Sequence, residues 1–183
     1  MSTDTGWFRF SNTDGRCLRA AARLLDAGAR ADELYKQLFQ TDRPQRVRLL
    51  GRAIASMDLR HDGLIAVMKL TQADFVEIGA QQGETENIVN EPLRIGSVEV
   101  SILLSETPDF DPPQGQAPVG QAAQPGVRLV RASLRSRGRV DVAAVARRFG
   151  GGGHVQAAGL RAAENVDTLA DKIVAICEEL LSQ

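Results

Sequence analysis

The second half of the chain alternates between apolar runs and short segments with helical spacing. Strand patterns cover residues 64–70, 97–105 and 127–136. Helical spacing covers residues 72–79, 85–93, 140–149 and 167–181. Because strands alternate with helices after residue 60, this part of the chain is predicted to be an α/β domain.

Local signals mark the ends of these elements. His61-Asp62-Gly63 is a turn signal, and Thr71 is expected to cap the helix that follows it. Asp141 lies near the start of the helix that precedes a run of glycines. The segment from Pro108 to Pro125 is rich in Pro, Gly and Gln and too long for a tight hairpin, so it is expected to be a disordered insertion between two strands.

The first 58 residues are mainly helical and contain too few strands for a sheet of their own. A strand-like stretch follows Gly6, and Thr13 is expected to cap a helix that has Gly28 at its C′ position. Two further helices are predicted, for residues 32–39 and 44–57. This region resembles the end of a larger folded unit. Its last helix, residues 44–57, lies where it can join two domains.

Composition indicates an ordinary soluble globular protein, with 183 residues, 43% of them apolar and 25% charged. The net charge of −1 provides no global attraction to nucleic acid or membrane, and the aromatic content of 4% argues against a platform of many base-stacking rings. No stretch has transmembrane length and no signal core is present, and Cys17 and Cys177 look like buried thiols in a reducing compartment. We therefore expect a cytoplasmic protein without a membrane partner.

Positive charge is concentrated between Val127 and Arg161. This window carries +7 and the rest of the chain −8, because eight arginines face one acid, Asp141. Arginine suits bidentate contacts with phosphate or carboxylate, so the window favours a local anion site, with a solvated arginine-rich face as the alternative. The eight are Arg128, Arg131, Arg135, Arg137, Arg139, Arg147, Arg148 and Arg161.

Four glycines, Gly150 to Gly153, lead directly into His154. Glycine permits positive φ and close approach of a ligand, and successive N–H groups in such a turn form an anion site. If residues 154–158 begin a helix, its N-terminal N–H groups add to that field. The alternative is a helix end followed by a flexible loop, with His154 an incidental surface residue.

Arg135 lies between a predicted strand and the helix before the glycines, a position where α/β sheets collect ligands. Ser133 and Ser136 are candidate hydroxyl donors beside it. Asp4, in the sequence Asp-Thr-Gly, has the chemistry to bind a divalent cation, but one carboxylate is not a metal site. His61 is interpreted as an exposed turn residue.

The sequence GRVDVAAVARRFGGGGHVQAAG, residues 138–159, resembles the DHH-associated domain, the C-terminal domain of DHH phosphoesterases. Three further stretches resemble other segments of the nanoRNase and pAp-phosphatase branch, which is related to RecJ exonucleases: residues 4–13, 84–104 and 133–146. The resemblance implies a small mixed β-sheet with flanking helices over residues 59–183. It also implies a helical remnant of the DHH domain over residues 1–43 and a linker helix over residues 44–58.

The resemblance implies a function as well. The family hydrolyses short oligonucleotides and pAp on two metals, usually manganese, and Asp4 falls on one metal ligand. The glycine–histidine loop and a strand-end arginine hold the nucleotide and its phosphate, and these roles fall on Arg135, Gly151, Gly152, Gly153 and His154. The partner is therefore expected to be a nucleotide or a short oligonucleotide.

The chain departs from the family in three places: the earlier Asp-rich and Asp-His-His metal motifs are absent, Asn87 stands where the family often has glycine, and the insertion after Pro108 is long. The preferred hypothesis is a catalytically incomplete piece of a phosphoesterase, either cut or mis-started. The alternative is a stand-alone nucleotide or single-stranded nucleic-acid binding module. An exposed interface on residues 1–58 favours self-association, such as a homodimer.

Overall fold

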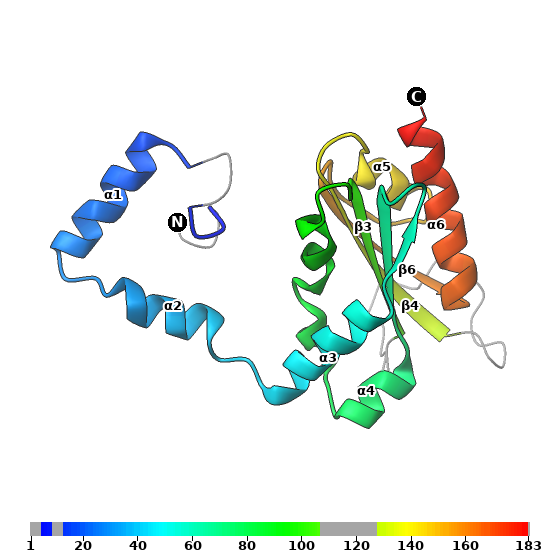
Figure 1. Ribbon diagram of the computed structural model, residues 1–183, viewed down its shortest axis with the longest axis horizontal. Helices are drawn as coiled ribbons and strands as arrows, with labels where there is room; N and C mark the ends of the chain where they lie inside the picture. Colours follow the sequence, from blue (N-terminus) through cyan, green and yellow to red (C-terminus); the bar gives the residue numbers. More distant parts are fainter. Residues whose placement is uncertain (1–4, 9–12, 107–127, 183) are drawn as a thin grey trace. The chain divides into compact units, whose positions relative to one another are not determined.

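A computed structural model describes residues 5–8, 13–106 and 128–182. The chain folds into two compact units, Met1–Asp42 and Arg43–Gln183 (Figure 1). Asp4 and the predicted insertion from Pro108 to Pro125 lie outside the described residues.

The second unit is built on a six-stranded sheet with the order β1-β2-β3-β4-β6-β5. The strands are β1 (Asp58–Arg60), β2 (Ile65–Leu70), β3 (Val100–Glu106), β4 (Arg128–Ser136), β5 (Gly152–His154) and β6 (Ala157–Glu164). Among these strands, β2 and β3 run parallel and the other neighbours antiparallel, so the expected mixed α/β sheet is confirmed. The sequence pattern did not predict β1, β5 or β6.

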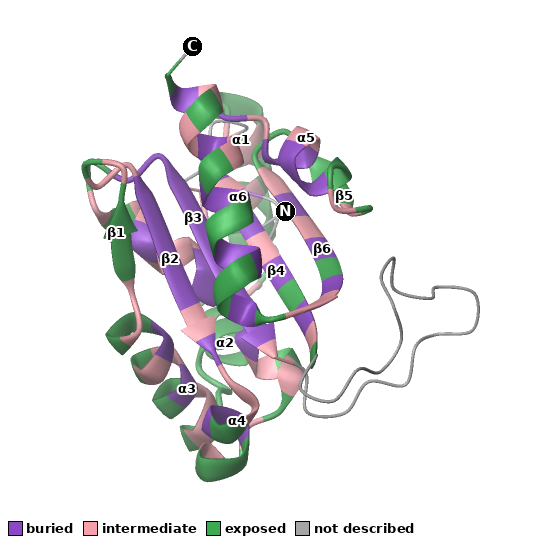
Figure 2. Ribbon diagram, turned by 90° about the vertical axis from the view of Figure 1, so that its right-hand side faces the viewer, coloured by how far each residue is buried: buried purple, intermediate pink, exposed green. Residues whose placement is uncertain are grey.

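Helices cover both faces of this sheet. On one face, α5 (Val142–Arg147) and α6 (Val166–Leu181) pack over the buried side chains of β2, β3, β4 and β6 (Figure 2). On the other face, α3 (Pro44–Ala55), α4 (Gln72–Ile78) and the 3₁₀ helix η2 (Ile88–Arg94) cover a smaller cluster. The alternation of strand side chains separates the two clusters: Ile102 belongs to the first and Leu103 to the second.

Capping side chains set the starts of two helices, and the cap at Thr71 was predicted. The Oγ1 of Thr71 accepts from the N–H of Asp74, and Asp74 accepts from the N–H of Thr71 at 2.7 Å, which completes a capping box. Asp141 accepts from the N–H groups of Ala143 and Ala144 at 2.9 and 3.0 Å. Each cap satisfies backbone donors that have no partner inside the helix.

The helix predicted for residues 85–93 is instead two 3₁₀ segments, η1 (Gln82–Thr85) and η2. Asn87 separates them with a φ of 65°, in the left-handed region. Pro92 then removes a backbone donor inside η2. Asparagine tolerates left-handed backbone better than most non-glycine residues, which explains how it replaces the glycine expected at this position.

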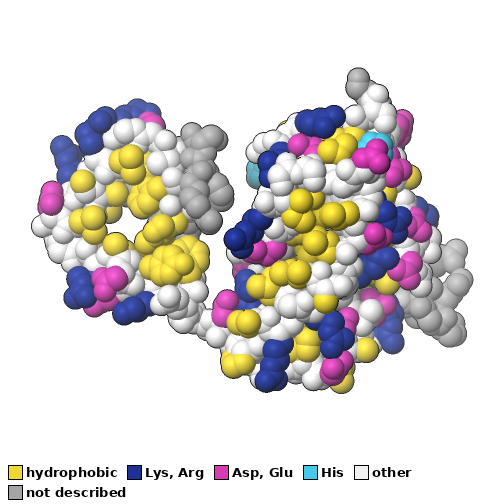
Figure 3. Space-filling model, in the orientation of Figure 1, with side chains coloured by type: hydrophobic (Ala, Val, Ile, Leu, Met, Phe, Trp, Pro, Cys, Tyr) yellow, Lys and Arg dark blue, Asp and Glu magenta, His cyan; other side chains and the backbone are white. Residues whose placement is uncertain are grey.

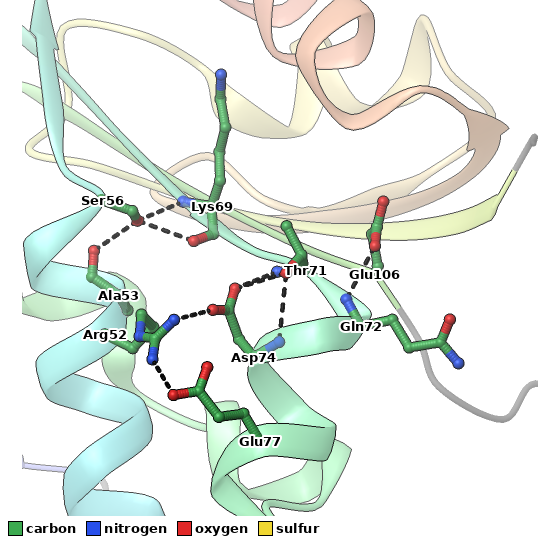
Figure 4. A network of polar contacts seen from close by, with 9 residues as sticks. All are labelled: Arg52, Ala53, Ser56, Lys69, Thr71, Gln72, Asp74, Glu77 and Glu106. Carbon is green, nitrogen blue, oxygen red and sulfur yellow. Dashed lines mark hydrogen bonds and ion pairs between the residues drawn. The ribbon is translucent and has the colours of Figure 1, made fainter.

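Helix α3 is tied to the second unit by a polar network (Figure 4). Arg52 donates to Asp74 of α4 at 2.6 Å and pairs with Glu77 at 3.0 Å. The Ser56 hydroxyl, just after α3, accepts from the N–H of Lys69 in β2 at 2.9 Å. The assignment of residues 44–58 as a linker between domains stays a prediction, and the packing of α3 makes it testable.

The first unit contains α1 (Gly15–Asp26) and α2 (Ala31–Phe39). Asp14, not Thr13, caps α1, because its side chain accepts from the N–H of Cys17 at 2.8 Å; this bond, followed by that with Arg16, lowers the pKa of Asp14. Gly28 follows the C-cap with a φ of 96°, as predicted.

The strand predicted after Gly6 is wrong over the described residues 5–8, which form a turn. The N–H of Phe8 donates to the Oγ1 of Thr5 at 3.1 Å, and Gly6, Trp7 and Phe8 all have positive φ. A local side-chain bond therefore competes successfully with extended backbone here.

Apolar side chains remain at the surface of the first unit (Figure 3). Neither α1 nor α2 contains a buried residue. Trp7 packs edge-on against Tyr35 and Phe39, with ring centroids 5.3 and 5.6 Å apart. The exposed apolar residues of the two helices are Leu18, Leu24, Leu25, Leu34, Tyr35, Leu38 and Phe39.

Candidate functional site

The strand register places Arg135 and His154 in one row of the sheet. Arg135 of β4 pairs with Ala157 of β6, and Ala157 pairs with His154 of β5. Directly paired residues of neighbouring strands point to the same face, so both side chains leave the same side, two strands or about 10 Å apart. The structure therefore brings together two residues that the sequence analysis singled out separately.

This row belongs to a surface that we call the open face. Its residues alternate with core positions: Val130, Ala132 and Leu134 of β4 are buried under α5 and α6, whereas Arg131 between them is exposed. Ser133, Ala157 and Gly159 form a floor of small, half-buried side chains. The open face consists of Arg131, Ser133, Arg135, His154, Ala157, Gly159 and Arg161.

Arg135 is a half-buried cation at the end of β4. Its guanidinium donates to the carbonyl oxygen of Leu134 at 2.9 Å, and no acid pairs with it within the described part of the chain. Burial, and then the positive charge of Arg131, lowers the pKa of Arg135. Because a guanidinium stays charged in proteins, an anion at this position would be stabilised.

Other arginines of the basic window have protein partners. Arg128, Arg147 and Arg148 pair with Glu106, Asp141 and Glu179, at 3.8, 3.5 and 3.6 Å. Arg137 donates to the carbonyl oxygens of Leu93 and Ile95, which fixes the end of η2. The window is therefore neither one anion site nor one uniform solvated face.

The two candidate serines differ. Ser136 is buried, and its hydroxyl accepts from the N–H of Gly138 at 2.9 Å, so it serves the turn after β4. Ser133 lies on the open face between Arg131 and Arg135.

Two of the glycines are required by packing. A Cβ on Gly151 would lie 2.4 Å from the oxygen of Gly159 and 2.6 Å from the Cβ of Leu160. Gly153 has a φ of 146°, and its Cβ would lie 2.4 Å from the oxygen of Ala157. Gly152, which is exposed, would meet nothing within 4 Å. Packing therefore does not account for the glycine at position 152.

The expectation that residues 154–158 begin a helix is wrong. β5 and β6 form a hairpin in which His154 pairs with Ala157, and the N–H of Val142 is bonded to the carbonyl oxygen of Val155 at 2.9 Å. No helix N-terminus adds its field at His154. The imidazole is exposed and makes no hydrogen bond or ion pair with any described residue.

The described residues do not fit a metal site, because no group of three or more His, Cys, Asp or Glu side chains among them is arranged to hold an ion. Within the same residues, no helix is long and apolar enough to cross a bilayer.

The structure is a mixed α/β domain in which the open face lies beside a glycine–histidine hairpin. Residues 65–180 match the DHHA1 domain, and the chain belongs to this family. It is thus a member of the DHH phosphoesterase superfamily, as its glycine–histidine motif indicated.

The chain is 32% identical over 157 residues to the bifunctional oligoribonuclease and PAP phosphatase NrnA of Thermus thermophilus, covering 86% of this chain and 41% of that protein. The NrnA of Bacillus subtilis is 24% identical over 178 residues, which are 96% of this chain and 50% of that one. A solved exopolyphosphatase-related protein from Bacteroides fragilis superposes with a TM-score of 0.83 at 25% identity, over 100% of this chain and 49% of its own. The chain spans half or less of the length of these relatives.

Proposed function

We propose that this chain holds the nucleotide substrate of a cytoplasmic DHH-family phosphoesterase, with the open face as the phosphate-binding surface. The observation that carries the proposal is the row Arg135–Ala157–His154, which sets on one face a guanidinium and an imidazole that, among the described residues, pair with no acid. The relatives, named as oligoribonucleases and PAP phosphatases, support short oligonucleotides or pAp as substrates.

In this proposal each group has a distinct task. The Arg135 fork donates to two phosphate oxygens, and His154 donates to a phosphate oxygen or a ribose hydroxyl. The exposed Gly152 lets the ligand approach the backbone. Asp4 would be one ligand of the two manganese ions of the whole enzyme, and those ions would supply Lewis-acid activation of water. The described residues bind and orient the substrate.

Arg135→Gln and His154→Ala are each expected to weaken the binding of pAp by about tenfold, since each removes a charge-assisted or neutral hydrogen bond to the ligand. Isothermal titration of the full chain measures this effect. Arg128→Gln is the matched control, because that arginine lies on the same strand and pairs with Glu106. Unchanged affinity in both test variants would show that the site lies elsewhere.

The chain by itself is expected to bind pAp weakly and in a salt-sensitive way, without hydrolysing it when manganese is added. The reason is that a two-metal site needs several carboxylate and imidazole ligands, and the described residues provide no such group. Phosphate release from pAp and cleavage of a dinucleotide are the assays. Turnover at ordinary enzyme rates would contradict catalytic incompleteness.

A further inference from the structure

A second basic row lies on the open face, separated from the first by the pair Ser133 and Gly159. Arg131 of β4 pairs in register with Arg161 of β6, and both residues are exposed. Like charges directly opposite each other on antiparallel strands repel. Within the residues that the structure describes, Arg131 has no acidic partner, whereas Arg128, three residues earlier, is paired with Glu106.

The two rows belong to the same surface. Arg131 and Arg135 are four residues apart on one strand face, so their Cα atoms are about 13 Å apart. Burial, and then the charge of Arg131, lowers the pKa of Arg135, as expected for two cations on one strand face. Long arginine side chains from both ends can therefore reach one short ligand that lies between them.

The surface between the rows is formed by small residues. Ser133 of β4 pairs there with Gly159 of β6, and both are only half-buried. A Cβ on Gly159 would have its nearest contact at 3.4 Å, with the oxygen of Ala132 beneath it. The residues between the rows are thus small and closely packed, and Ser133 contributes a hydroxyl group.

We propose that Arg131 forms a second phosphate subsite, so that the open face takes a ligand carrying two or more phosphate groups. The inference rests on the proposed function, because Arg135 and His154 hold the first phosphate. Once that phosphate is bound, the second contact is intramolecular and adds affinity at a high effective concentration. A ligand with a single phosphate gains nothing from Arg131.

The test compares two nucleotides on the full chain: AMP, with one phosphate, and the dinucleotide pApA, with two. Arg131→Gln is expected to weaken pApA binding by about tenfold and to change AMP binding by about twofold or less. The slope of log affinity against log salt concentration for pApA should decrease by about 0.7, the value for one phosphate contact on a single strand. Arg128→Gln should leave both affinities unchanged, and thermal unfolding verifies that each variant is folded.

The outcomes separate this inference from the proposed function. If Arg135→Gln weakens both ligands while Arg131→Gln leaves pApA binding unchanged, the second subsite is overturned and the proposed function stands. If the unsubstituted chain binds neither AMP nor pApA, both are overturned. Inorganic tripolyphosphate tests whether the nucleoside is needed. If Arg131→Gln weakens the binding of tripolyphosphate as much as that of pApA, the subsite binds phosphate chains without a nucleoside.

Discussion

Replacing Gly151 by alanine is expected to lower the free energy of unfolding of the second unit by about 3 kcal/mol, whereas the same change at Gly152 is expected to alter it by less than about 0.5 kcal/mol. The two residues are neighbours in sequence and chemically identical. The difference arises because a Cβ on Gly151 meets the backbone of β6, 2.4 Å from the oxygen of Gly159, and a Cβ on Gly152 meets nothing within 4 Å.

The close contact of a Cβ at Gly151 cannot be relieved by moving a flexible side chain. The colliding oxygen belongs to the backbone, and Leu160 beside it is a core residue with 4% of its surface exposed. Moving either atom would shift β6 against β4. Gly153→Ala is expected to be similarly harmful, since it combines a contact of 2.4 Å with a φ of 146° that L-residues rarely adopt.

Urea denaturation followed by circular dichroism measures these differences, with Gly152→Ala as the control. Equal stability of the Gly151 and Gly152 variants would contradict the close approach of β5 to β6. The Gly152 variant also has a use in ligand binding: if it is stable but binds pAp less tightly, the exposed glycine serves the ligand and not the fold.

Leu49→Ala is expected to destabilise the second unit by about 3 kcal/mol, the usual range for emptying a leucine site in a core. Leu49 lies in α3 and is fully buried in the cluster that contains Phe75 and Leu103. The substitution leaves a cavity between α3, α4 and β3. Helix α3 is therefore expected to be part of the folding unit that carries the open face.

Val47→Ala, in the same helix, is the control, because the valine has 57% of its surface exposed and the change should alter stability by only about 0.5 kcal/mol. Both variants are measured by urea denaturation of the full chain. A Leu49 variant as stable as the Val47 variant would show that α3 does not pack on the sheet in solution. Residues 44–58 would then be better described as a free linker.

The sequence by itself determined the parts that depend on neighbours along the chain. The cap at Thr71 is satisfied within three residues, so its side-chain chemistry sufficed to predict it. The apolar runs of β2, β3 and β4 and the periodicity of α6 are similarly local. The glycine–histidine motif was specific enough to indicate the family that residues 65–180 match.

Tertiary structure decided the elements whose residues have no strong local preference. β5 consists of two glycines and a histidine, and β6 is rich in alanine, so neither has the composition of a strand. They are strands because β4 offers an edge to β6, and β6 offers one to β5. The same pairing brings His154 beside Arg135, although 18 residues intervene in the chain.

Register also decided which residues of the basic window can act together. Strand periodicity places Arg131 and Arg135 on one face of β4 and Arg128 on the other, but only the structure shows that Arg128 pairs with Glu106 and that β6 extends the face of the other two. The role of each glycine likewise depends on what lies opposite it, which the sequence does not contain. Local chemistry therefore fixed the cap at Thr71 and the family motif, and strand pairing assembled the surface on which the function is proposed.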